Sequence, residues 1–433
     1  MSNRPETNKQ SCPVYKKCGG CQLQNLSYPE QLEFKQRKVE KLLKRFCTVE
    51  KIIGMKTPYH YRNKVQAAFY TDKKGKIISG VYQSGSHHVV GIDSCQTEDV
   101  IADKIIVAVR KLLPSFRMTT YNEDTGKGFL RHILVKRGFA TNQIMLVLVT
   151  GTPVFPSKNN FVKAILKQFP EITTIVQNIN PYRTNLVLGD NQKVLYGKGY
   201  IEDILCGCRF RISPKSFYQI NPVQTEVLYG KAIEFANLKG NETVLDTYCG
   251  IGTIGIIAAK NGAGNVIGAE LNGDAVRDAI VNARANNLKN IRFYKADAGE
   301  FMREAADEDE KPDVVFMDPP RAGSDRKFLD SLIKMSPKKV VYVSCNPETL
   351  ARDLAYLTQN SPYKAQKIQP VDMFPHTAHI ETVVKLVRKT PDAYVDLKVD
   401  MDELDLTASE AKATYEEIKQ YILDKYDTKV SNL

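Results

Sequence analysis

The first pattern along the chain is an amphipathic helix close to the N-terminus. Apolar residues recur at helical spacing at Leu32, Val39, Leu42 and Phe46. Ser27 precedes this run and Glu30 follows Ser27 by three positions, which is the spacing of a capping box. The sequence therefore predicts a helix over about 28–46, with a strongly basic exposed side.

Between residues 53 and 214 the hydrophobic positions form short β-rich runs. Three of these runs are IMLVLVTG at 144–151, TTIVQNIN at 173–180 and NLVLGD at 185–190. Turn-forming residues interrupt the region at 72–75 and 189–191. This texture predicts a central α+β domain that is mostly antiparallel.

From about residue 215 apolar strands alternate with amphipathic helices. The strand-like runs include TVLDTYCG at 243–250, NVIGAEL at 265–271, DVVFMDPPR at 313–321 and KKVVYVSCNP at 338–347. A helix is expected over about 348–358, followed by a last strand in HIETVVKLVR at 379–388. Such alternation predicts an α/β fold, a Rossmann-like doubly wound sheet that binds ligands at the carboxyl ends of its strands.

Composition and charge restrict the classes of protein that fit this pattern. The chain has 433 residues, 42% hydrophobic and 25% charged, which suits a globular protein. No run approaches ~18 apolar residues and the N-terminus has no apolar signal region, so we expect a cytoplasmic protein without a membrane partner. We also expect a monomer. The net charge is +12, although residues 391–433 hold 11 acidic and 5 basic residues. The basic body favours a nucleic-acid partner.

Three acidic residues end successive predicted strands. Asp246 precedes a loop with Gly250 and Gly252, where the backbone can approach a ligand closely. Glu270 ends the next strand, where a carboxylate can accept both hydroxyls of a ribose. Asp297 ends the third and could meet an adenine edge, although strand termination or helix capping would also explain it. The set resembles the S-adenosylmethionine site of Rossmann-like methyltransferases.

The fourth and fifth strands end in groups suited to covalent chemistry. Asp318 is followed by two prolines that stiffen its loop, and then by Arg321 where amine-directed methyltransferases usually have an aromatic residue. Cys345 follows at the same expected edge. Methylation of uracil C5 needs a thiolate that adds to C6 and a base that removes the C5 proton. His376, His379 and Glu381 are the candidate bases.

Together these motifs resemble the RNA 5-methyluridine methyltransferases, and in particular the branch that modifies uridines of 23S ribosomal RNA. The resemblance also includes Cys12-x5-Cys18-x2-Cys21, Tyr61-Arg-Asn-Lys64, Phe217-Tyr-Gln219, Ser344-Cys-Asn-Pro347 and His379-Ile-Glu381. It implies Cys345 as nucleophile and Glu381 as proton acceptor. It further implies four S-adenosylmethionine contacts, at Gln219, Tyr248, Glu270 and Asp318.

The resemblance implies a [4Fe–4S] cluster held by four thiolates, at Cys12, Cys18, Cys21 and Cys95. Four thiolates suit zinc equally well, so the spacing alone leaves the metal open. The tRNA-directed relatives generally lack this set, which favours 23S rRNA as the RNA partner. The same chemistry on tRNA, or a noncatalytic RNA-binding or assembly protein, remain the alternatives.

These expectations divide the chain into five parts. They are a Cys-rich iron–sulfur segment at 1–27, a linking basic helix at 28–52 packed on the catalytic domain, a central RNA-binding domain at 53–214, a methyltransferase domain at 215–389 and an acidic extension at 390–433. A helix capped by Thr407 and Glu410 is expected within the extension.

Overall fold

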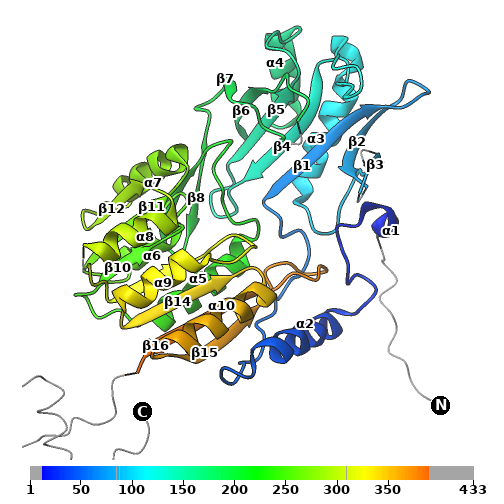
Figure 1. Cartoon of the computed structure of the whole chain (residues 1–433). Helices are drawn as coiled ribbons and strands as arrows, with labels where there is room; N and C mark the ends of the chain where they lie inside the picture. The colour runs from blue at the N-terminus through cyan, green and yellow to red at the C-terminus, as the bar shows by residue number, and fades with distance from the viewer. Residues whose placement is uncertain (1–11, 84, 87, 185, 309, 390–433) are drawn as a thin grey trace, which may run out of the picture. The chain divides into compact units, whose positions relative to one another are not determined.

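Two seven-stranded sheets organise the chain in the computed structural model, which describes residues 12–389 apart from 84, 87, 185 and 309 (Figure 1). The described residues belong to one compact unit, so the finer domain boundaries remain predictions. The acidic extension and its expected helix lie outside the described residues. Within the described part, no helix is long and apolar enough to span a membrane.

The first sheet has the strand order β3-β2-β1-β4-β5-β6-β7, and only β5 and β6 pair in parallel. Its strands are β1 (Lys64–Thr71), β2 (Ile77–Tyr82), β3 (Val89–Gly91), β4 (Leu130–Arg137), β5 (Ile144–Thr150), β6 (Ile172–Ile179) and β7 (Asn191–Tyr196). One face packs against α3 (Val100–Leu112) and α4 (Lys158–Gln168), and the short 3-10 helix η1 (Pro114–Phe116) follows α3. Because the other face is also covered, β5 is buried along its whole length. The predicted, mostly antiparallel α+β arrangement is confirmed.

The second sheet has the order β12-β11-β10-β13-β14-β16-β15, in which β16 alone runs antiparallel to its neighbours. Its strands are β10 (Thr243–Asp246), β11 (Asn265–Glu270), β12 (Ile291–Lys295), β13 (Val314–Met317), β14 (Lys339–Ser344), β15 (Tyr363–Val371) and β16 (Glu381–Arg388). The order reverses between β10 and β13, which is where a doubly wound sheet opens a crevice for a ligand.

Helices cover both faces of this second sheet, as the sequence predicts. One layer is α5 (Pro222–Ala236), α6 (Thr253–Lys260) and α7 (Gly273–Ala285), and the other is α8 (Ala298–Asp307), α9 (Arg326–Met335) and α10 (Pro347–Asn360). The hairpin of β8 (Ile201–Leu205) and β9 (Cys208–Ile212) shares one apolar core with the first layer and with the central sheet.

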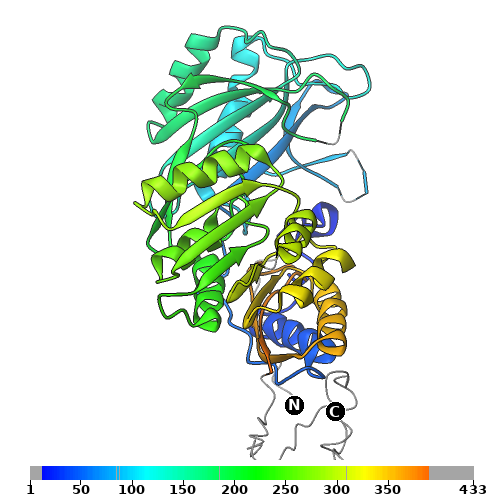
Figure 2. The same ribbon diagram turned by 60° about the vertical axis from the view of Figure 1, so that its left-hand side comes forward.

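The N-terminal segment joins the second layer. After the short α1 (Tyr15–Cys18), α2 (Tyr28–Leu43) lies beside α10 and β15, as Figures 1 and 2 both show. The capping box is confirmed, since the Glu30 carboxylate accepts hydrogen bonds from the Ser27 amide at 2.7 Å and hydroxyl at 2.6 Å. The helix ends three residues before the predicted limit. Its buried stripe is Gln31, Lys35, Val39 and Leu43.

One expectation about strands was wrong, and one strand was not expected. The run at 186–190 is a loop, and β7 begins only at Asn191. Asn180 holds this loop by donating to the carbonyls of Leu186 and Val187, and Gly189 lies too close to the Ile179 carbonyl for any side chain. In the second sheet, β15 was not predicted because its exposed positions carry lysine and glutamine rather than a continuous apolar run.

Candidate active site

The carboxyl edge of the second sheet brings the predicted chemical groups together. Asp246 and Glu270 end adjacent parallel strands, and Asp318 directly follows β13 on the other side of the reversal point. Cys345 directly follows β14. Because β16 is antiparallel, its first residue, Glu381, lies at this same edge, and the pairing of Ser344 with Thr382 places it beside Cys345.

The glycine loop after β10 is built around two carboxylates. Gly250 and Gly252 have φ angles of 55° and 82°, which L side chains adopt only with strain. The Gly250 amide donates to Glu270 Oε2 at 3.1 Å, and the Asn272 amide donates to Oε1 at 2.7 Å. Each Glu270 oxygen therefore retains acceptor capacity for a ligand hydroxyl.

Asp246 lies beneath this loop and is fully buried. Its Oδ2 accepts from the Gly255 amide at 2.7 Å, whereas Oδ1 has no partner among the described residues. Burial and the neighbouring Glu270 charge raise the Asp246 pKa to about 7. Burial and Asp246 likewise raise the Asp318 pKa to about 7. An incoming cation or hydrogen-bond donor would offset the cost of ionising these carboxylates.

Gln219 and Tyr248 lie on two different loops, before α5 and after β10. The Gln219 side chain donates to the Tyr229 hydroxyl at 3.3 Å, and its backbone carbonyl accepts from the side chain of Asn63, just before β1, at 3.1 Å. Tyr248 packs its ring 5.4 Å from that of Phe328, and its hydroxyl contacts Ser324 at 3.3 Å. Tyr229 was not singled out from the sequence, because nothing in its helical run distinguishes it from a core residue.

Asp297 plays a local structural part. Its carboxylate caps α8 by accepting from the amides of Gly299 and Glu300 at 2.9 and 3.2 Å. The side chain is exposed. The capping interpretation of Asp297 is confirmed, and the expected contact with an adenine edge stays a prediction.

Cys345 and Glu381 lie beside each other at this edge. Glu381 is only 4% exposed, and burial together with the charge of Asp318 raises its pKa well above the usual range. Burial, Glu381 and Asp318 raise the pKa of the half-buried Cys345 thiol to about 11. The Arg321 guanidinium opposes both shifts. Arg321 is thus the positively charged side chain that acts on both Cys345 and Glu381.

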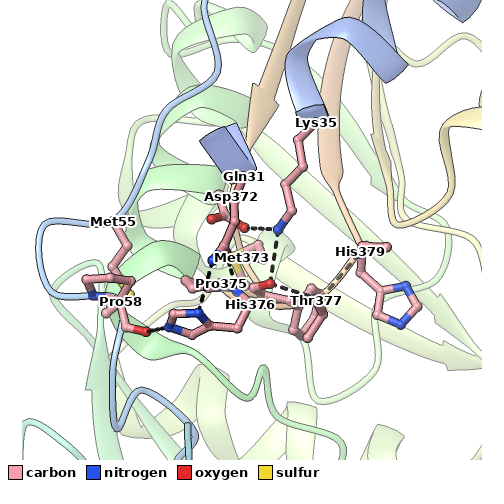
Figure 3. Close-up of polar contacts among 12 residues, drawn as sticks. Gln31, Lys35, Met55, Pro58, Asp372, Met373, Pro375, His376, Thr377 and His379 are labelled. Atoms are coloured by element: carbon pink, nitrogen blue, oxygen red, sulfur yellow. Dashed lines mark hydrogen bonds and ion pairs between the residues drawn. The ribbon is translucent and has the colours of Figure 1, made fainter. Parts of the chain in front are cut away.

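The two histidines near Glu381 have different surroundings. The His376 ring is buried and contacts the Pro58 carbonyl at 2.9 Å and the Gln31 amide at 3.2 Å. Both of its nitrogens are therefore already engaged. His379 is half-buried and lies beside Arg321, and Figure 3 shows its ring turned away from the Gln31–His376 cluster.

The pKa of Cys345 gives a direct test of this geometry. In the free protein, the rate of Cys345 alkylation by iodoacetamide should rise about tenfold per pH unit above neutrality and level off near pH 11, because only the thiolate reacts. Peptide mass spectrometry would follow this site separately from the other thiols. A plateau already reached by pH 8 would contradict the described surroundings.

The four cysteines predicted to bind a metal cluster line one small cavity. Cys12, Cys18 and Cys21 come from the first segment, and Cys95 joins them from the loop after β3. Burial and the neighbouring Cys95 raise the Cys21 pKa to about 12. Among the described residues, no three Cys, His, Asp or Glu side chains are grouped closely enough to hold a single metal ion.

Comparisons with known proteins agree with this arrangement. The model of the tRNA (uracil-5-)-methyltransferase family matches residues 185–389. RNA methyltransferases of Clostridium tetani and Listeria monocytogenes serotype 4b are 45% and 46% identical over 377 and 379 residues, which cover 86% and 87% of this chain and 81% and 83% of theirs.

A solved structure is also similar along most of its length. It is the Pyrococcus abyssi tRNA (uracil-54, C5)-methyltransferase in complex with S-adenosyl-L-homocysteine, with a TM-score of 0.72, 30% identity and 88% coverage of both chains. Fold, edge geometry and sequence similarity agree. The chain belongs to the tRNA (uracil-5-)-methyltransferase family and is an RNA methyltransferase.

Proposed function

We propose that this enzyme transfers a methyl group from S-adenosylmethionine to C5 of a uridine in 23S rRNA through a covalent adduct between Cys345 and C6. The observation that carries the proposal is the position of Cys345 beside Glu381, at the same sheet edge as Asp246, Glu270 and Asp318. A thiol, a base and a nucleotide-type pocket are the three parts that C5 methylation requires.

The chain's own residues fit the methyl donor. The unpartnered Asp246 Oδ1, the open acceptor positions of Glu270 and the glycine loop lie together near the reversal point of the sheet, where doubly wound folds bind their ligands. The donor supplies a methyl group on a positively charged sulfur. Gln219, Tyr248, Glu270 and Asp318 would hold it, and its positive charge would favour the ionised form of the nearby carboxylates.

The bonds balance in three steps. The Cys345 thiolate adds to C6 of the uracil, and the resulting enolate uses C5 to take the methyl group, whose bond to the donor sulfur breaks and leaves that sulfur as a neutral thioether. Glu381 then accepts the proton from C5, and the bond between Cys345 and C6 breaks to restore the thiolate and the uracil double bond. Cys345 must lose its proton first, and Arg321 favours this by opposing the rise that burial and the two carboxylates give to its pKa.

The choice of 23S rRNA rests on the four-cysteine set, which resembles that branch of the family. The Pyrococcus abyssi tRNA enzyme, at 30% identity over most of the chain, favours tRNA as the second candidate substrate. A noncatalytic RNA-binding role fits less well, because Cys345, Glu381, Asp318 and Gln219 are all present.

Mass-spectrometric mapping of 5-methyluridine tests activity and substrate together. RNA from cells that lack the protein should lose this nucleoside at one or more 23S rRNA positions, and re-expression should restore it. Loss from tRNA alone would transfer the proposal to tRNA. Unchanged 5-methyluridine in both RNA classes would contradict the proposed activity.

We further propose that Cys12, Cys18, Cys21 and Cys95 hold a [4Fe–4S] cluster. All four line one cavity, which supports a shared ligand. Among the described side chains no three Cys, His, Asp or Glu groups lie close enough to hold a metal ion, so this proposal rests on the shared cavity and on the resemblance of the four-cysteine set.

Metal analysis after anaerobic purification should find about four irons and four sulfides per chain, as four-thiolate cubane sites contain. Cys95→Ser should lose most of this iron although Cys95 is distant in sequence, because it would remove one of the four ligands. Cys47→Ser is the matched control, since the half-buried Cys47 lies outside the cavity. Stoichiometric zinc in colourless protein would refute the cluster.

A further inference from the structure

The loop between β15 and β16 delivers Glu381 to the site. The strand pairing ends with Val371 opposite Glu381, so residues 372–380 form the closed end of this hairpin. The loop directly precedes the proposed base in the sequence. Its buried residues Asp372 and His376 face Gln31 and Lys35 of the N-terminal segment (Figure 3). What holds this loop therefore also holds the backbone from which Glu381 projects.

The N-terminal segment supplies most of the polar contacts to this loop. Lys35 Nζ donates to Asp372 Oδ1 at 2.5 Å and to the Phe374 carbonyl at 3.0 Å, and both charged side chains are fully buried. The Tyr61 hydroxyl donates to the Pro375 carbonyl at 3.0 Å. These contacts join residues more than 300 positions apart in the sequence.

Gln31 and His376 form the centre of the contact. The His376 amide donates to Gln31 Oε1 at 2.8 Å, and the His376 carbonyl accepts from the Leu23 amide at 2.9 Å. Since the Pro58 carbonyl can only accept, the His376 Nε2 carries the proton and its Nδ1 accepts from the Gln31 side chain. Burial lowers the His376 pKa, which agrees with this neutral form.

His376 also has a φ angle of 69°, in the left-handed region that a residue other than glycine adopts only when its surroundings hold it. Gln31 bonds both the backbone and the ring of His376, and the Leu23 amide and the Pro58 carbonyl bond the same residue. We expect the loop to relax toward a more common backbone conformation when Gln31 is lost.

We propose that Gln31, with Lys35 and Tyr61, is a positioning residue for Glu381, so that the N-terminal helix is part of the catalytic unit. This inference rests on the proposed function, because it concerns the base of that reaction. A general base must lie within hydrogen-bond reach of its proton, and small displacements of a catalytic group lower its effectiveness strongly. Loss of Gln31 should therefore slow proton removal more than the steps before it.

The test is Gln31→Leu in the full-length enzyme, with RNA substrate and S-adenosylmethionine. In a single turnover the methylated protein–RNA adduct should form at close to the wild-type rate and then decay at least about tenfold more slowly. A denaturing gel with labelled RNA would follow both phases. Binding of S-adenosylmethionine should stay within about twofold of wild type, because Gln31 does not touch that pocket.

Gln36→Leu is the matched control on the same helix. Gln36 donates to the Glu50 carbonyl and accepts from the Ile52 amide, so it holds the segment after α2 and not the loop. It should lower the thermal unfolding temperature without prolonging the adduct. Gln31→Glu should restore much of the decay rate, because its carboxylate keeps the acceptor for the His376 amide. Equal adduct lifetimes in Gln31→Leu and Gln36→Leu would overturn the proposal.

Tyr61→Phe keeps the test decisive if Gln31→Leu fails to fold. It removes only the hydroxyl that bonds the Pro375 carbonyl and should prolong the adduct several-fold, whereas an unchanged lifetime would overturn the proposal.

The outcomes also distinguish failure of the proposed reaction from failure of the proposed positioning role. Absence of any adduct in wild type and in Glu381→Gln would refute the proposed chemistry. An adduct trapped by Glu381→Gln but not by Gln31→Leu or Tyr61→Phe would refute the positioning role alone.

Discussion

Replacement of Cys345 by alanine is expected to remove methyl transfer entirely, by a factor of about 10⁴ or more in turnover. The uracil C5 carbon becomes nucleophilic only after a thiolate has added to C6, and Cys345 is the thiol that follows β14 beside Glu381, whereas the buried Cys249 lies in the loop after β10. Without Cys345, neither the product nor a covalent RNA complex should form.

Binding of S-adenosylmethionine separates this loss from misfolding. Cys345→Ala should retain it within about threefold, because Gln219, Glu270 and Asp318 are unchanged, and isothermal titration would measure it. Cys47→Ala is the matched control, a half-buried thiol whose hydrogen bond goes to the Thr48 carbonyl, and it should turn over normally. Turnover by Cys345→Ala at even one-tenth of the wild-type rate would exclude Cys345 as the nucleophile.

The sequence predicts this edge because parallel strands direct their carboxyl ends to one side of a sheet. Asp246, Glu270 and Asp318 each follow a short apolar run, so their common position follows from periodicity alone. The position of Glu381 does not follow in this way. It depends on β16 entering the sheet antiparallel between β14 and β15, and β15 shows no clear apolar signal.

The sequence pattern does not predict the contacts between α2 and the 372–380 loop. Helical periodicity marks apolar residues as the buried face of α2, yet its two most N-terminal buried positions are Gln31 and Lys35. Their partners, His376 and Asp372, are more than 330 residues away, and only the folded chain places them together. Asp297 illustrates the opposite case, in which a local helix cap explains a residue that also suited a ligand.

Glu381→Gln should give the opposite result to Cys345→Ala at the covalent step. Glutamine has nearly the shape of glutamate but cannot accept the C5 proton, so addition and methyl transfer should proceed while elimination stalls. Turnover should fall by about 10²–10⁴-fold, the range for loss of a general base. A methylated protein–RNA adduct should then accumulate as a shifted band on a denaturing gel.

Two controls decide whether this trapped adduct identifies the base. Glu242→Gln changes a buried carboxylate before β10, at the opposite end of its strand, where it accepts the Lys239 and Gly240 amides, and it should trap nothing. His379→Ala removes the rival base, whose ring lies beside Arg321. An adduct in His379→Ala but not in Glu381→Gln would transfer the role of base to His379.

The rate of elimination should also depend on pH. Because burial and Asp318 raise the pKa of Glu381, elimination in wild type should slow as the pH falls and the carboxyl becomes protonated, whereas Glu381→Gln should lose this dependence.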